Sequence, residues 1–568
     1  MNKSDYYSHY IKYKKKYFDL KYKINQNQSA GAGGPVPPAP QDILNINYSD
    51  FNNTDAIFFS KKKNIKIIVD TQSSINITNI SNLDNLEELI IESIEYNNNI
   101  IIEDNFLKNS NIKKITFIKC NIISIGDNFM NNCLQLINAD NLFKDCGNLE
   151  NIGNNFMNNC HKLEYANKLF EDCKNLQMIG NNFMNNCYKL EYANNLFEDC
   201  KNLQMIGDNF MNNCNNLSNI DKIFFNCNNL QIIGNNFMNY CPKLKNISKM
   251  FENHGNLEKI GNNFMNYCDN LDDISEIFAN CGNLKEIGNY FMSNQTALKK
   301  VENIFDGCLN LKKINNFFLS NCKNIINIKN IFSANNEIQI IGDYFMSKNS
   351  FQVLNNFNQL FQNLTKLTTI GNNFMCETNI TDMNSFFNNC IELRYIGNNF
   401  FSQCLSLKQA ASLFENCEKL ISIGNNFMYN CQKLEKALKL FYNCKSLSSI
   451  GNNFMDYCLD LKSISLMFRG CIELKEIQEN FLSHLKEVQN IDSLFINCQK
   501  LQKIGNYFLM NFKVNGTNGK KILFNFKYNY KLIIGPSFLG FNNLSEINSS
   551  LNIIHNNIQS SEISWKEI

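Results

Sequence analysis

The sequence predicts an α/β fold, an elongated solenoid of 27-residue repeats built from short strands and short helical turns. The first observation is a block of the type Ile-Gly-Asn-Asn-Phe-Met. It recurs in 27-residue steps from Ile125 to Ile341 and resumes, after a slip of two residues, from Ile370 to Ile504. The second is that gaps of three and four residues dominate between the apolar positions of each repeat. A fixed period of about 20–50 residues is typical of stacked repeats, which share one continuous core.

One repeat, residues 179–205, reads IGNNFMNNCYKLEYANNLFEDCKNLQM and divides into two similar halves. In each half we expect one short helical turn around the aromatic residue and the cysteine, followed by a short extended segment. Gly180 is expected at a sharp turn, where φ is positive or two backbones crowd together. Antiparallel helical hairpins are the alternative, which Gly and Asn at fixed positions disfavour. The pattern leaves open whether a repeat forms one coil or two.

Composition divides the chain into segments around this array. Residues 1–27 carry Tyr, Leu and Ile at heptad spacing among lysines, which is typical of a basic helix; it is either a solvated helix or tail, or a docking helix. Residues 28–41, QSAGAGGPVPPAPQ, form a Gly/Pro linker. Residues 42–121 are expected to be degenerate repeats that cap the array at its N-terminal end. Residues 122–512 are the regular array, and 513–568 are a C-terminal cap and tail.

The 23 cysteines follow the repeat and predict buried thiols. From Cys133 to Cys241 they alternate at spacings of 13 and 14 residues, without CxxC pairs, and the five histidines are scattered. This spacing does not fit a zinc site. We expect small apolar thiols in the core; a disulfide between neighbouring repeats is the alternative. No metal ligands and no cofactor site are predicted.

Charge and motifs indicate a protein without catalytic activity. The net charge is +2, which argues against nucleic acid as a partner, and no small-molecule substrate is evident. No nucleophile–base pair, metal set or phosphate loop is recognisable, so no catalytic residue is assigned. No run of 18 apolar residues indicates a membrane span, and the N-terminus has no apolar signal core. We therefore expect a reducing, cytoplasmic location.

Two adjacent repeats, 152–178 and 179–205, are nearly identical. They differ only at His161 against Tyr188 and at Lys168 against Asn195. Duplication of a whole surface argues against a single catalytic constellation. The four differing residues are candidates for setting binding specificity, with neutral surface drift as the alternative.

The repeat IGNNFMNNCYKLEYA resembles the IGxxAFxxCxxLxxI consensus of BspA-like leucine-rich repeats, and LFEDCKNL resembles a related MFxxCxxL element. The unit is longer than the common one, near 23 residues, and lacks its Pro-containing strand end. The N-terminal YYSHYIKYKKKYFDLKYK resembles the leader of many giant DNA virus proteins of the mimivirus type. The resemblance implies a leucine-rich-repeat protein in host cytosol or in a virion.

These observations together predict a non-enzymatic solenoid that presents an extended surface to a protein partner. The identity of that partner is not encoded in any motif. The alternative is a structural role, as a component or spacer of a virus particle or fibre.

Overall fold

The computed structural model describes residues 43–49, 62–69, 75–77, 85–94, 99–326, 328, 330–332, 335–349 and 360–511, and the backbone of strands at 532–534 and 563–565. The chain divides into two units, Met1–Ile43 and Leu44–Ile568, and the second holds the repeats. The predicted segments 1–27 and 28–41, and most of 513–568, lie outside the described residues. No helix in the described part is long and apolar enough to cross a membrane.

The described elements are all strands, most of them two residues long in the array. They are β1 Ile43–Asn47, β2 Asn64–Val69, β3 Ile75–Ile77, β4 Glu88–Ser93, β5 Asn99–Ile102, β6 Lys114–Ile118, β7 Asn121–Ile125, β8 Asn151–Ile152, β9 Met178–Ile179, β10 Met205–Ile206, β11 Ile232–Ile233, β12 Lys259–Ile260, β13 Glu286–Ile287, β14 Lys313–Ile314, β15 Ile340–Ile341, β16 Thr369–Ile370, β17 Tyr395–Ile396, β18 Ser422–Ile423, β19 Ser449–Ile450, β20 Glu476–Ile477, β21 Lys503–Ile504, β22 Leu532–Ile534 and β23 Ile563–Trp565.

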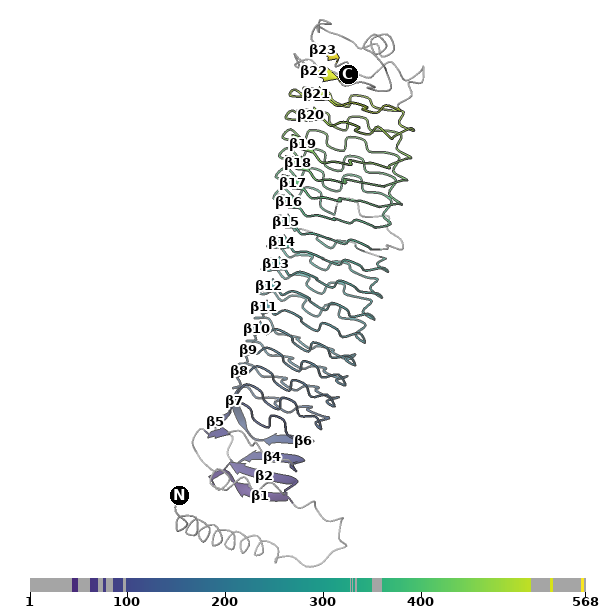
Figure 1. The fold of residues 1–568 in the computed structure, drawn as a ribbon. Helices are drawn as coiled ribbons and strands as arrows, with labels where there is room; N and C mark the ends of the chain where they lie inside the picture. The colour runs from purple at the N-terminus through teal and green to yellow at the C-terminus, as the bar shows by residue number, and fades with distance from the viewer. Residues whose placement is uncertain are drawn as a thin grey trace, which may run out of the picture. The chain divides into compact units, whose positions relative to one another are not determined.

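Each 27-residue repeat forms one coil of a parallel β-solenoid (Figure 1). Met178 pairs with Met205, and Met205 with Ile232, so equivalent residues of successive repeats lie side by side. Strands β3, β5 and β7–β19 form one 15-stranded parallel sheet. A second ladder of single bridges, such as Tyr165 with Tyr192, lies half a repeat away with the same offset. The question of one coil or two is thereby settled as one, and helical hairpins are excluded.

The prediction of short helical turns is wrong: residues 99–511, where described, contain no helix. In the first half of a repeat, Asn182, Met184 and Asn186 all have positive φ, between 47° and 60°. This geometry points amide groups along the stack. Asn182 N–H donates to the Asp208 carbonyl of the next coil, and Met184 N–H to the Phe156 carbonyl of the previous one. The turns are therefore held by neighbouring coils and not by bonds along a helix.

Gly180 is needed for close approach of two backbones, not for a positive φ. A Cβ atom at this position would lie 2.6 Å from the carbonyl carbon of Gly153 in the previous coil. One of the two expected reasons for this glycine is thus confirmed. Asparagine is the commonest residue at the left-handed positions, which it tolerates because its short polar side chain bonds locally. The asparagine content consequently has a structural role.

Side-chain ladders fill the coil interior and its turns. Phe156 and Phe183 stack with centroids 5.0 Å apart, and Phe170 and Phe197 with centroids 5.3 Å apart. These are two parallel columns of buried rings, which meet at tilted angles. On the turn surface Asn182 Nδ2 donates to the Asn155 Oδ1 of the previous coil at 2.9 Å. The same contact continues from Asn105 to Asn263 and again from Asn373 to Asn453, which makes two asparagine ladders.

The long sheet ends after β19, where the repeat changes. Gln478 stands in place of the glycine, and its Nε2 donates to the Ile450 carbonyl at 2.9 Å. In the preceding coil the equivalent carbonyl, that of Ile423, accepts a hydrogen bond from the backbone N–H of Gly451. A side chain thus replaces a ladder bond, and β20–β23 form a separate four-stranded sheet.

Candidate functional site

The cysteine columns lie in the core, where most thiols donate a hydrogen bond to a backbone carbonyl, a role that the sequence pattern did not indicate. All 23 cysteines are free thiols, and all but Cys120 and Cys146 are buried. Cys187 Sγ donates to the Met157 carbonyl at 3.2 Å, across the boundary between two coils. Burial raises the pKa of Cys187 to about 12. These thiols therefore pair buried carbonyls and are poor nucleophiles.

Substitutions within a cysteine column show that the position favours a donor. Gln295 Nε2 donates to the Met265 carbonyl at 2.6 Å. Asn349 Nδ2 donates to the Leu319 carbonyl at 2.9 Å. In both cases an amide takes over the bond to the residue 30 positions earlier. The columns are thus part of the scaffold.

One histidine–carboxylate pair resembles part of a catalytic dyad. His484 Nδ1 lies 3.6 Å from Asp456 Oδ1, and burial lowers the pKa of His484 and raises that of Asp456. However, His484 Nε2 accepts the Tyr457 backbone N–H at 2.8 Å. The nitrogen that a general base needs is therefore occupied. Among the described residues, no group of three or more His, Cys, Asp or Glu side chains is placed to hold a metal ion.

The four residues that distinguish the duplicated repeats fall into two columns. The rings of His161 and Tyr188 lie next to each other on the surface, with centroids 4.8 Å apart. Lys168 and Asn195 both occupy a left-handed position. Lys168 forms an ion pair with Glu171 at 3.1 Å, and Asn195 bonds to Glu198 in the equivalent way. The second pair is therefore accounted for by local structure, while the first remains a surface feature.

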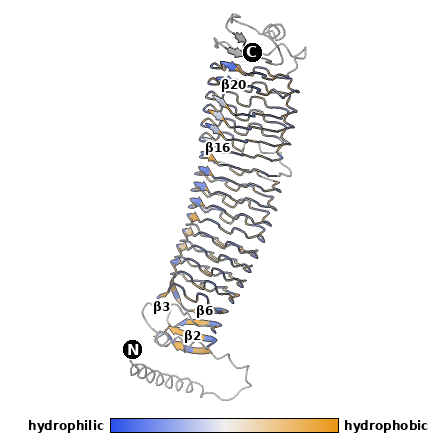
Figure 2. Ribbon diagram, viewed as in Figure 1, coloured by the Kyte–Doolittle hydropathy of each residue, from blue (hydrophilic) through white to orange (hydrophobic). Residues whose placement is uncertain are grey.

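The outer column of the 15-stranded sheet changes in chemistry from coil to coil. Met178 and Ile232 are exposed, with the half-buried Met205 between them. Lys259 and Glu286 follow in register in the next two coils. Figure 2 shows the strands changing between hydrophobic and hydrophilic colours along the sheet. A constant core thus carries a variable outer column.

A gap interrupts the second ladder between two coils, a feature that the repeat pattern did not predict. In neighbouring coils every second amide along the second half of a repeat donates to the next coil, as when Ala193 N–H donates to Asn219 and Phe197 N–H to Ile223. Residues 217–257 are all described, yet the equivalent backbone bonds between 218–226 and 245–252 do not form. The coils rejoin beyond the gap, where Glu258 N–H donates to Gln231.

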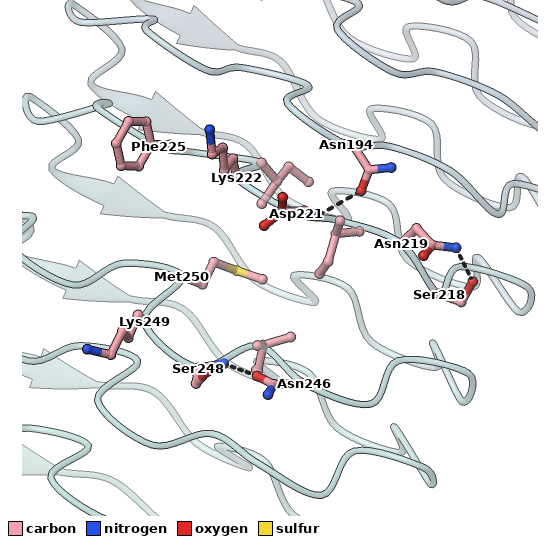
Figure 3. Close-up of a pocket in the computed structure, with 13 residues that line it drawn as sticks. Asn194, Ser218, Asn219, Asp221, Lys222, Phe225, Asn246, Ser248, Lys249 and Met250 are labelled. Carbon is pink, nitrogen blue, oxygen red and sulfur yellow. Dashed lines mark hydrogen bonds between the residues drawn. The ribbon is translucent and has the colours of Figure 1, made fainter.

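The gap is a cavity of about 520 Å³ that opens to the surface (Figure 3). Its lining residues are Asn194, Ser218, Asn219, Ile220, Asp221, Lys222, Ile223, Phe225, Asn246, Ile247, Ser248, Lys249 and Met250. An Asx ladder also stops here. Asn194 Oδ1 accepts the Asp221 N–H at 2.9 Å, but the Ser248 N–H, which would reach Asp221, bonds at 2.7 Å to Asn246 Oδ1.

His254 is a departure from the repeat that lies close to the gap. It stands in a cysteine column, where Cys227 and Cys281 donate to carbonyls of the previous coil at 3.1 and 3.2 Å. The buried imidazole is larger than a thiol, and its Nδ1 lies 3.2 Å from the Glu252 carbonyl of its own coil. Beside this imidazole the Phe224 and Phe251 rings still stack with centroids 5.4 Å apart, so the aromatic core continues across the boundary between the two coils. A cysteine position is also substituted at Gln295 and Asn349, where an amide keeps the bond to the previous coil, so the substitution by itself does not predict a gap.

No protein-family model matches the sequence, and no curated protein matches it. Among solved structures, the chain is similar to a leucine-rich repeat protein from Bacteroides ovatus, with 18% identity over 76% of this chain and 88% of that one, at a TM-score of 0.28. It is similar to a chain of the Drosophila Toll–Spatzle complex, with 14% identity over 82% of this chain and 61% of that one, at a TM-score of 0.35. It is also similar to a leucine-rich repeat protein from Eubacterium ventriosum, with 13% identity over 79% of this chain and 91% of that one, at a TM-score of 0.19.

Proposed function

We propose that this protein is a non-enzymatic interaction scaffold that binds a protein partner along the outer column of its 15-stranded sheet. The observation that carries the proposal is the contrast between columns. Inward positions repeat Ile, Phe, Cys and Leu with almost no change, whereas the outer column runs through Met, Ile, Lys, Glu and Tyr in strict register. Extended arrays of this kind bind partners over several repeats.

The exposed apolar stretch formed by Met178, Met205 and Ile232 is the part of the column best suited to anchor a partner. Apolar residues gathered in adjacent coils mark interaction surfaces more often than single exposed ones do. The charged rungs that begin at Lys259 would give a polar border to the contact. The surface pair His161 and Tyr188 then remains a second candidate contact.

The test is affinity capture from the native host with the wild-type chain and two double variants. Met178→Glu with Ile232→Glu should lose the captured partner and keep the fold, because both side chains point outward. Ser422→Glu with Ser449→Glu adds the same charges to the same column and should leave capture unchanged. Equal capture by all three proteins would contradict the assigned face.

The second candidate function is a structural component or spacer of a virus particle or fibre, which the near-identity of repeats 152–178 and 179–205 favours. It goes with the proposal that the chain is a BspA-like protein of a giant virus, located in host cytosol or in the virion. Stoichiometric presence in purified particles, without a captured host protein, would support this function over the first. A cytosolic pool bound to a partner would support the scaffold.

A further inference from the structure

The coils 450–476 and 477–503 are joined by backbone bonds along one half only. In their second halves the usual bonds form, as when Phe468 N–H donates to the Leu494 carbonyl at 3.1 Å. In their first halves, which are fully described, β19 and β20 follow each other along the stack (Figure 1) but are not paired. The Asn453 amide has no backbone bond to the following coil, and the asparagine ladder ends at the same residue. One half of this boundary therefore lacks the ladder that holds the neighbouring coils.

Two side chains bridge the boundary where the backbone ladder is missing. Gln478 Nε2 donates to the Ile450 carbonyl at 2.9 Å. The Tyr457 backbone N–H donates to His484 Nε2 at 2.8 Å, whereas in earlier coils the equivalent amide donates to a backbone carbonyl of the next coil. An imidazole nitrogen thus replaces a peptide carbonyl as the acceptor. Unlike a carbonyl oxygen, this nitrogen is blocked when it takes up a proton near neutral pH.

The aromatic core runs across this boundary without a break. The rings of Phe454 and Phe481 stack with centroids 5.1 Å apart, and those of Phe468 and Phe495 with centroids 5.8 Å apart. The two coils therefore stay packed together in the interior. What the two side-chain bonds hold is the outer turn of the first half, so the loss of one bond loosens this turn and leaves the stack in place.

We propose that His484 makes this half-joined boundary a pH-sensitive joint, which is closed when the imidazole is neutral and loosens when it is protonated. In the closed joint Nε2 accepts a hydrogen bond, so the single ring proton lies on Nδ1, the nitrogen 3.6 Å from Asp456 Oδ1. A second proton, taken from water, binds to Nε2 and faces the Tyr457 N–H, so two donors meet and their bond is lost. The proposal concerns control of the array and does not depend on the partner-binding face.

The surroundings of His484 set the direction of the pH response. The titratable and charged groups at this turn are Asp456 and Tyr457 on the preceding coil and Lys486 and Glu487 on its own coil, while the following coil presents Met510 and Asn511. Burial lowers the pKa of His484 below its ordinary value of 6.5, and the Asp456 carboxylate acts in the opposite direction. The closed joint therefore favours the neutral ring and should loosen as the pH falls below 6.5. Burial also raises the pKa of Asp456, so its restraint weakens in more acidic solution.

The test is hydrogen exchange of the full-length chain at pH 7.5 and pH 5.5, resolved to single amides and corrected for the intrinsic effect of pH on exchange. The reference is the Gln403 amide, which occupies the same position two coils earlier and donates to the Tyr429 carbonyl at 2.7 Å. The protection of the Tyr457 amide relative to Gln403 should fall about three- to tenfold at the lower pH. The Phe468 amide, on the joined half, should keep its protection. A constant ratio of Tyr457 to Gln403 protection, or an equal loss at Phe468, would overturn the proposal.

Two variants separate the imidazole from the rest of the boundary. His484→Gln offers an amide oxygen that does not titrate, so the ratio of Tyr457 to Gln403 protection should be the same at both pH values. Asp456→Asn removes the carboxylate that stabilises the protonated ring in the closed joint, so the fall in this ratio should be larger than in the wild-type chain. Because the second variant keeps the imidazole, it tests the proposal independently of how well glutamine fits. Unless the fall is absent in His484→Gln and larger in Asp456→Asn, the assignment to His484 is wrong.

Discussion

Replacing Asn182 and its neighbour Asn181 by alanine and by glycine tests how the turns are built. Asn182 has a φ of 58°, donates through Nδ2 to Asn155 at 2.9 Å, and accepts from Asn209 at 2.8 Å. Asn182→Ala removes two ladder bonds, about 0.5–1.5 kcal/mol each. It also places a Cβ-bearing residue without a local polar group in the left-handed region, which costs about 1–2 kcal/mol. The expected loss is about 2–5 kcal/mol.

Asn182→Gly loses the same two bonds but relieves the left-handed backbone, at an entropic cost of about 0.5–1 kcal/mol. It should therefore be more stable than Asn182→Ala by about 0.5–1 kcal/mol. Asn181 bonds to Asp208 N–H through its side chain at 2.7 Å and is not among the residues with positive φ. At Asn181 the order should reverse, with alanine more stable than glycine by a similar amount.

The assay is the urea midpoint of all four variants, together with native-state hydrogen exchange of the amides in the same coil. Exchange is needed because a repeat array unfolds by nearest-neighbour steps, so that one global transition does not describe it. The same order of alanine and glycine at both positions would refute the left-handed assignment. Unchanged stability in both Asn182 variants would refute the ladder.

Three further predictions concern the core and the repeats. Native labelling with a thiol reagent at pH 8 should modify few cysteines, and denaturation should expose nearly all. Burial raises the pKa of Cys187 to about 12, from about 8.5 in the unfolded chain, so the stability that this thiol contributes is present below about pH 8.5 and is lost as the pH rises toward 12. An unfolding midpoint that stays constant up to about pH 11 would contradict this. Deletion of residues 179–205 in register should keep the fold and lower partner affinity gradually, whereas unfolding would show that the coils depend on more than their neighbours. Removal of residues 1–41 should leave the thermal midpoint of the array nearly unchanged, and a drop of several degrees would show that they cap it.

The sequence predicted which residues form the core better than it predicted their backbone. Ile179, Phe183 and Cys187 belong to the apolar pattern of the repeat 179–205, and all three are fully buried. The same spacing of three and four residues was interpreted as helical, and that was wrong. A turn with alternating left-handed residues also brings every third or fourth side chain inward. Spacing alone therefore does not distinguish the two conformations.

The candidate sites were harder to foresee, because they depend on contacts between coils. The outer column follows from the register and was anticipated as an extended face. The gap leaves the apolar pattern of residues 218–226 and 245–252 intact, and only His254 in a cysteine position departs from the repeat. A missing hydrogen bond between two backbones has no side-chain signature.

The sequence by itself determined the period, the stacking of equivalent residues and the membership of the core, because these depend on which side chains recur. The tertiary structure decided the handedness of the turns, the carbonyl that each thiol pairs and the position of the gap. The physical reason is that each coil obtains its hydrogen bonds from the coils before and after it. The hydrogen bonds of Asn182 and of Asp221 are thus made with residues 27 positions away.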